Sequence, residues 1–150
     1  MDENIDSKQL LVVDASVILA AIFPQEAYKR HAMMFIDQSM RSAKKFIAPS
    51  ILLYEIFNAV RSAILSKRIT GEEAQTILSA YKTIEPTYVD FSILSESALK
   101  IALESNTSIY DAAYAALAYA REYSMCTLDK KLIQKLKVLP VNVVYLGDFG

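Results

Sequence analysis

The sequence is poor in cysteine, histidine, glycine and proline, and it lacks long apolar runs. It contains one cysteine and one histidine, which excludes an internal disulfide framework and a zinc site of Cys and His ligands. Three glycines and four prolines argue against disorder. No apolar run approaches the ~20 residues that span a bilayer, and residues 1–9 lack the basic start and apolar centre of a signal peptide. We therefore expect a cytoplasmic protein that does not cross a membrane.

Apolar residues, by contrast, are plentiful. They make up 53% of the 150 residues, enough for the packed core of one domain, which we expect to span residues 1–150 with its core at about 10–146. The net charge of −1 gives no general attraction to nucleic acid. Local clusters of basic side chains are present, each with a solvated helix end as its ordinary explanation: 44–45, 67–68, and 130–131 with 135 and 137.

Short apolar runs alternate with amphipathic segments along the chain. The β-branched run Leu10 to Val13 predicts a buried parallel strand. Further strands are expected at 46–48, 89–91, 125–128 and 142–146, and helices at 16–23, 25–41, 50–67, 70–83, 92–105, 108–123 and 130–137. Ser50 is a predicted N-cap, and Thr70 with Glu73 forms a capping box. The alternation predicts a three-layer α/β/α sandwich with a central, mostly parallel, short-stranded sheet, from which the helix pair 50–83 projects.

Four acids occupy positions where a carboxylate needs an explanation: Asp14, Glu55, Asp111 and Asp129. Each has an ordinary one, because Asp14, Asp111 and Asp129 could cap helices and Glu55 could be a partly exposed helix residue. Their joint placement is more informative. Two follow predicted strands and two lie in the first turns of helices, so all four can meet at the carboxyl edge of a parallel sheet. Clustered carboxylates repel unless a cation neutralises them, and oxygen ligands favour Mg²⁺ or Mn²⁺.

The segments around these acids resemble the PIN-domain ribonucleases, and among them the VapC-type toxins of toxin–antitoxin pairs. The matching pieces are VVDAS (12–16), PSILLYEIFNA (49–59), YDAAY with ALA (110–114 and 116–118) and TLDKKL (127–132). Four pieces in this order cover nearly the whole chain. The resemblance implies a PIN-like fold in which the four acids bind one or two Mg²⁺ or Mn²⁺ ions, supported by Ser16, Asn58 and Thr127.

The same resemblance implies hydrolysis of RNA phosphodiester bonds, leaving 5′-phosphate and 3′-hydroxyl ends. Arg121, Lys130 and Lys131 are candidates to follow the phosphates, and a cognate antitoxin and a second copy of the chain are the implied protein partners. Ile18, Ile22 and Phe23 are candidates to face such a partner, with core packing as the alternative. For His31 and Tyr114 we expect packing roles.

Two other functions remain open at the level of sequence. The chain could be a non-catalytic PIN-fold module that binds RNA or protein, although four intact acids argue against it. A metal-dependent phosphatase or DNA nuclease is the second, but Asp14-Ala15-Ser16 lacks the second acid of Asp-x-Asp phosphatases. The RNA target, the number of metal ions and a toxin role against a processing role are not readable from the sequence.

Overall fold

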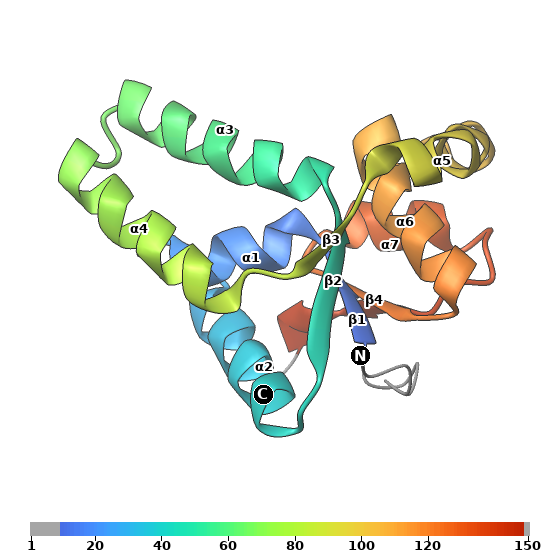
Figure 1. The fold of residues 1–150 in the computed structure, drawn as a ribbon, viewed down its shortest axis with the longest axis horizontal. Coiled ribbons are helices and arrows are strands. Elements are labelled where there is room, and N and C mark those ends of the chain that lie inside the picture. Colours follow the sequence, from blue (N-terminus) through green and yellow to red (C-terminus); the bar gives the residue numbers. More distant parts are fainter. Residues whose placement is uncertain (1–9, 149–150) are drawn as a thin grey trace.

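A computed structural model of the protein describes residues 10–148 and contains a five-stranded sheet between two layers of helices (Figure 1). The strand order is β3-β2-β1-β4-β5, and every neighbouring pair in it is parallel. The strands are β1 (Leu10–Val13), β2 (Lys45–Pro49), β3 (Thr87–Val89), β4 (Ser124–Thr127) and β5 (Val143–Tyr145). The predicted three-layer α/β/α architecture is therefore confirmed.

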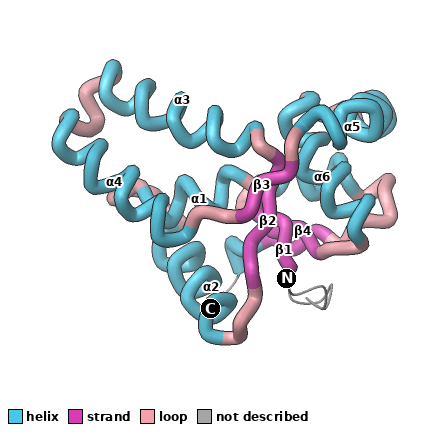
Figure 2. Tube along the Cα trace, in the orientation of Figure 1, coloured by secondary structure: helices cyan, strands magenta, loops and turns pink. Residues whose placement is uncertain are grey.

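The helices that connect the strands cover both faces of the sheet (Figures 1 and 2). They are α1 (Ala15–Ile22), α2 (Lys29–Arg41), α3 (Ile51–Leu65), α4 (Gly71–Ile84), α5 (Phe91–Ser105), α6 (Ile109–Arg121) and α7 (Lys130–Leu136). Helices α3 and α4 extend away from the sheet as a pair, as the sequence predicts, and the capping box of Thr70 and Glu73 begins α4. Among the described residues, no helix is both long and apolar enough to cross a membrane.

Strand β1 lies at the centre of the sheet because its residues are apolar on both faces. Val12 and Val13 are fully buried, and the alanine-rich helix α6 packs against β1 and β2. Ala112 to Ala118 of α6 are all buried, so small side chains let this helix approach the sheet closely. Ile18, Ile22 and Phe23 belong to the same core, and this agrees with the core-packing alternative for them rather than a free surface.

Three local predictions are wrong, each for a physical reason. Helix α2 begins at Lys29 rather than at residue 25, because the ammonium of Lys29 folds back and donates to the carbonyls of Ala21 and Phe23 at the end of α1. Strand β3 ends at Val89, since the Asp90 side chain accepts from the Ser92 N–H and begins α5.

Ser50 is the third case. It precedes α3, but its hydroxyl does not cap that helix. Instead, Ser50 Oγ accepts from the Phe91 N–H at 3.1 Å, while the Ser50 N–H donates to the Val89 carbonyl at 2.8 Å. These bonds join the carboxyl ends of β2 and β3 and fix the point where α3 leaves the sheet.

Candidate active site

The direction of the chain across the sheet changes between β1 and β4. From β1 the chain adds β2 and then β3 on one side, and it later crosses back to add β4 and β5 on the other. Asp14 follows β1, and Asp129 follows β4 after one intervening residue. In open parallel sheets, ligands bind beyond the carboxyl ends of strands at such a switch point. Two of the four acids therefore stand where this fold places a ligand.

Asp14 is held by hydroxyl groups on one of its two oxygens. Thr127 Oγ1 donates to Asp14 Oδ2 at 2.6 Å, and Ser16 Oγ donates to the same oxygen at 2.9 Å. The Asp14 N–H donates to the Cys126 carbonyl, which fixes the backbone of β1 against β4. Only 5% of Asp14 is exposed, so its carboxylate has a defined direction. Both hydroxyls bind Oδ2, which leaves Oδ1 outside this network.

Asp129 has a structural role as well as a place at this edge. Its Oδ1 accepts from the backbone N–H groups of Lys131 and Leu132 at 3.0 and 3.1 Å, so it is the N-cap of α7. Its own N–H donates to Thr127 Oγ1, and the Leu128 N–H donates to Ser16 Oγ. The Ser16 and Thr127 hydroxyls thus join the Asp14 and Asp129 segments. Both capping bonds use Oδ1, so capping is compatible with a further role for the carboxylate.

The other two acids come from helices, Asp111 from α6 and Glu55 from α3. Asp111 lies in the first turn of α6, where its N–H donates to the hydroxyl of the N-cap residue Ser108. Glu55 lies in the second turn of α3, and the Tyr114 hydroxyl donates to Glu55 Oε1 at 2.8 Å. Asp111 and Tyr114 are three residues apart and so lie on one face of α6. This face carries the acid Asp111 and, through Tyr114, contacts the acid Glu55 of α3.

Three of the four carboxylates have raised pKa values. Burial raises the pKa of Asp14, and the charge of Asp111 raises it further, against the hydrogen bonds from Thr127 and Ser16 that lower it. Burial raises the pKa of Glu55 to about 7, with the charges of Asp14 and Asp111 acting in the same direction. Burial also raises the pKa of Asp111, and the charge of Asp129 adds to this. Asp14, Glu55 and Asp111 therefore share an environment that disfavours their negative charges, and the charge of Asp129 acts on this group through Asp111.

This environment fits a divalent cation by its chemistry. Neither of the two ion pairs within residues 10–148, Arg41 with Asp37 and Lys82 with Glu85, involves one of the four acids. In the same part of the chain, no three His, Cys, Asp or Glu side chains are arranged so that they could already hold a metal ion. The acids are thus close enough to repel one another but are not drawn together. The charge of Lys135 offsets only part of the rise in the pKa of Asp111. An oxygen-only set of carboxylates is the donor set that Mg²⁺ and Mn²⁺ prefer.

The remaining candidate residues lie in different places. Asn58 is exposed one turn after Glu55, but the described contacts of Glu55 run to Tyr114 and none to Asn58. Lys130 and Lys131 follow Asp129 directly and so stand at the same edge as the acids. The ammonium of Lys130 lies 5.2 Å from the centre of the Tyr145 ring, a cation–π contact at the carboxyl end of β5.

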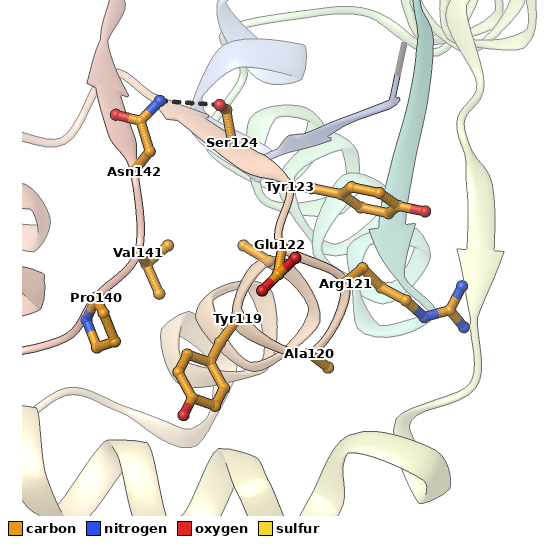
Figure 3. A pocket seen from close by; sticks show the side chains of 10 residues that line it. Tyr119, Ala120, Arg121, Glu122, Tyr123, Ser124, Pro140, Val141 and Asn142 are labelled. Atoms are coloured by element: carbon orange, nitrogen blue, oxygen red, sulfur yellow. Dashed lines mark hydrogen bonds between the residues drawn. The ribbon is translucent and has the colours of Figure 1, made fainter. Parts of the chain in front are cut away.

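Arg121 lies at the opposite edge of the sheet. It ends α6 and lines an open hollow of about 720 Å³ with residues that precede β4 and β5, including Glu122 and Asn142 (Figure 3). Arg121 comes ten positions after Asp111 along the helix, a rise of about 15 Å. The structure therefore brings the four acids, Ser16 and Thr127 to one edge and does not bring Arg121 there.

Tyr114 is the residue of this site that the sequence did not single out. Its surroundings in the alanine-rich stretch predict packing, and the ring is indeed 1% exposed. The helical spacing contained a signal, because a residue three positions after Asp111 shares its face. A buried tyrosine hydroxyl usually donates a hydrogen bond to a nearby acceptor, and a cluster of acids supplies such acceptors.

Comparison with known proteins agrees with this geometry. Residues 11–138 match the sequence profile of the PIN domain. The chain is 31% identical over 122 residues to Ribonuclease VapC1 of Mycobacterium tuberculosis, covering 81% of this chain and 86% of that protein. It is 26% identical over 133 residues to Ribonuclease VapC3 of Pyrobaculum aerophilum, covering 86% and 96%. The structure of VapBC2 from Rickettsia felis, bound to a DNA fragment from their promoter, superposes with a TM-score of 0.63, at 16% identity and 91% and 98% coverage.

The protein belongs to the PIN domain family. Within that family it is similar to the VapC ribonucleases, and the resemblance seen in the sequence is confirmed. The superposition with VapBC2 supports the fold.

Proposed function

We propose that this protein is a metal-dependent endoribonuclease, the toxin of a toxin–antitoxin pair, acting in the cytoplasm. One observation carries the proposal: Asp14 is buried at the switch point of the sheet, is oriented through Oδ2 by two hydroxyls, and interacts electrostatically with Asp111 and Glu55. The relatives named VapC ribonucleases support the choice of RNA as substrate. The VapBC structures among the similar folds support an antitoxin as partner.

In this proposal Asp14, Glu55, Asp111 and Asp129 hold the ion, which is Mg²⁺ or Mn²⁺. A bound divalent ion supplies a water-derived nucleophile near neutral pH and neutralises charge on the reacting phosphate. The protein contributes the directions of its carboxylates. Thr127 and Ser16 hold Asp14 through one oxygen, and the cap of α7 holds Asp129 through one oxygen. None of these bonds uses the second oxygen of its carboxylate.

The substrate has to approach this edge against the negative charge of the acids. Lys130 and Lys131 stand beside Asp129 and are placed to contact a phosphate that reaches the ion. No protein nucleophile is required, and Cys126 is not suited to act as one. Its thiol is 2% exposed, and burial raises its pKa to about 12. The products expected from attack by water are 5′-phosphate and 3′-hydroxyl ends.

A second copy of the chain is the other proposed partner. Helix α3, which projects from the sheet, exposes five large apolar side chains: Leu53, Tyr54, Phe57, Ile64 and Leu65. Exposed apolar surface of this kind is typical of protein interfaces. Sedimentation at micromolar concentration is expected to give the mass of a dimer, and Phe57→Glu is expected to shift it towards that of a monomer. A monomer in the unsubstituted protein would remove this part of the proposal.

Cleavage of end-labelled RNA by the purified protein tests the enzymatic part of the proposal. We expect cutting with Mn²⁺ or Mg²⁺, none in EDTA, and recovery when the metal is added back. Analysis of the cut ends is expected to give 5′-phosphates. Folded protein that binds Mn²⁺ yet cuts no RNA, including structured tRNA and rRNA, would favour the non-catalytic binding module instead.

A further inference from the structure

The hydroxyl group of Tyr114 connects two of the acidic segments. It donates to Glu55 Oε1 at 2.8 Å and so joins α6 to α3 across 59 residues of sequence. The Tyr114 ring is almost fully buried, at 1% exposure, and sits between pairs of buried alanines on α6. The hydroxyl is the single polar feature of this buried stretch from Ala112 to Ala118. Phenylalanine would fill the same space, so packing alone does not account for the hydroxyl.

A neutral donor at this point has a specific consequence for a metal ligand. A lysine or arginine would also orient Glu55, but its charge would neutralise the carboxylate and compete with a cation. A phenol fixes one oxygen and leaves the negative charge in place. Asp14 is also held by uncharged donors on one oxygen, because the Thr127 and Ser16 hydroxyls both donate to Oδ2. Two acids from different segments are therefore each held on one oxygen by uncharged hydroxyls.

We propose that Tyr114 is a positioning residue for Glu55. Its hydroxyl holds Oε1 and so would fix the orientation of the carboxylate when Glu55 binds the ion. Glutamate has three side-chain torsions, and it loses affinity for a ligand if those torsions must be ordered at the moment of binding. This inference rests on the proposed function, since it requires that Glu55 bind the metal. Hydrogen-bond partners that orient metal ligands typically change metal affinity or activity by about 10–100-fold when removed.

Replacing Tyr114 with phenylalanine removes the hydroxyl and keeps the ring. We expect the dissociation constant for Mn²⁺, measured by calorimetry or by the EPR signal of free Mn²⁺, to rise about 10-fold or more. The Mn²⁺ concentration giving half-maximal RNA cleavage is expected to rise by the same factor. At saturating Mn²⁺ the cleavage rate is expected to return to within a few-fold of the unsubstituted protein.

Tyr81→Phe is the matched control. Tyr81 is fully buried on α4, and its hydroxyl pairs with that of Tyr88, so this substitution also removes a buried hydroxyl but away from the acids. It is expected to leave the affinity for Mn²⁺ unchanged, whatever it does to the melting temperature. If Tyr114→Phe changes only the melting temperature and leaves the affinity for Mn²⁺ as it was, Tyr114 is a packing residue and the inference is wrong.

A double-mutant cycle of Tyr114 and Glu55 provides a second test of the inference. In a Glu55→Gln background, Tyr114→Phe is expected to have no further effect on Mn²⁺ affinity, because the residue it positions no longer carries charge. Equal effects in both backgrounds would contradict the inference. Direct Mn²⁺ binding separates this result from the proposed function: binding without RNA cleavage refutes the ribonuclease alone, whereas absence of binding by the unsubstituted protein refutes both.

Discussion

Asp14→Asn is expected to lower the rate of metal-dependent RNA cleavage by about three orders of magnitude or more, as losses of central catalytic groups do. Asparagine keeps the shape of the side chain and can still accept from Thr127 and Ser16. What it loses is the negative charge, which a divalent cation requires of its ligands. Because burial raises the pKa of Asp14, its charge opposes folding in the absence of metal. We therefore expect the metal-free variant to be at least as stable as the unsubstituted protein.

Two further variants provide comparisons for the cleavage rate of Asp14→Asn. Asp37→Asn removes an exposed carboxylate on α2 whose one ion pair within residues 10–148 is with Arg41, and it is expected to leave cleavage unchanged. Thr127→Val removes one of the two hydroxyls on Asp14 Oδ2, and a loss of about 10–100-fold is expected. Rates from single-turnover cleavage, with melting temperatures for each protein, provide the comparison. An Asp14→Asn protein that cleaves RNA at the unsubstituted rate would remove Asp14 from the site.

The metal-free protein is expected to lose stability as the pH rises from about 5 to about 8. Burial raises the pKa of Glu55 from its ordinary 4.5 to about 7, and it also raises those of Asp14 and Asp111. Between pH 4.5 and 7 the folded protein keeps a proton on Glu55 that the unfolded chain has released. The free energy of unfolding therefore falls with rising pH across this window and levels off for Glu55 above it.

Mn²⁺ is expected to reverse this loss. At about 100 times its dissociation constant, a ligand of the folded state adds about 2.7 kcal/mol, which corresponds to roughly 5–11 °C in melting temperature for a domain of this size. The gain is expected to be larger at pH 8 than at pH 5.5, since protons compete for the same oxygens. Glu55→Gln should flatten the pH dependence. Melting curves that are independent of pH and of Mn²⁺ would show that the acids do not form a coupled metal site.

The sequence predicts the acids better than it predicts what holds them. Asp14 and Asp129 could be placed because each follows an apolar strand, and strand ends of a parallel sheet meet at one edge. The Tyr114–Glu55 contact depends on how closely α6 and α3 approach one another. That distance is set by tertiary packing, which a helical pattern does not contain.

Local capping signals were reliable only where both partners are near in sequence. The Thr70 and Glu73 capping box forms as predicted, since its two bonds span three residues. Ser50 has the same chemical capacity, yet its hydroxyl binds the Phe91 N–H, 41 residues away. The start of α2 was misplaced for a similar reason, because the Lys29 ammonium donates to the Ala21 carbonyl of α1. In each case a donor or acceptor from another segment competed with the local one. The sequence of the neighbouring residues does not predict such a distant partner.

The hydrogen bond from Thr127 to Asp14 has a consequence for when the proposed active site can form during synthesis. Its two partners are 113 residues apart, and the strands that carry them are adjacent in the sheet. At ~5–20 residues per second, a ribosome takes roughly 6–20 s to make the second partner after the first. Until β4 emerges and joins β1, a nascent chain has neither the oriented Asp14 nor Asp129. Under the proposed function, a polypeptide with this strand order would lack a complete site for cutting nearby RNA, including the message and ribosome that produce it, for most of its own synthesis.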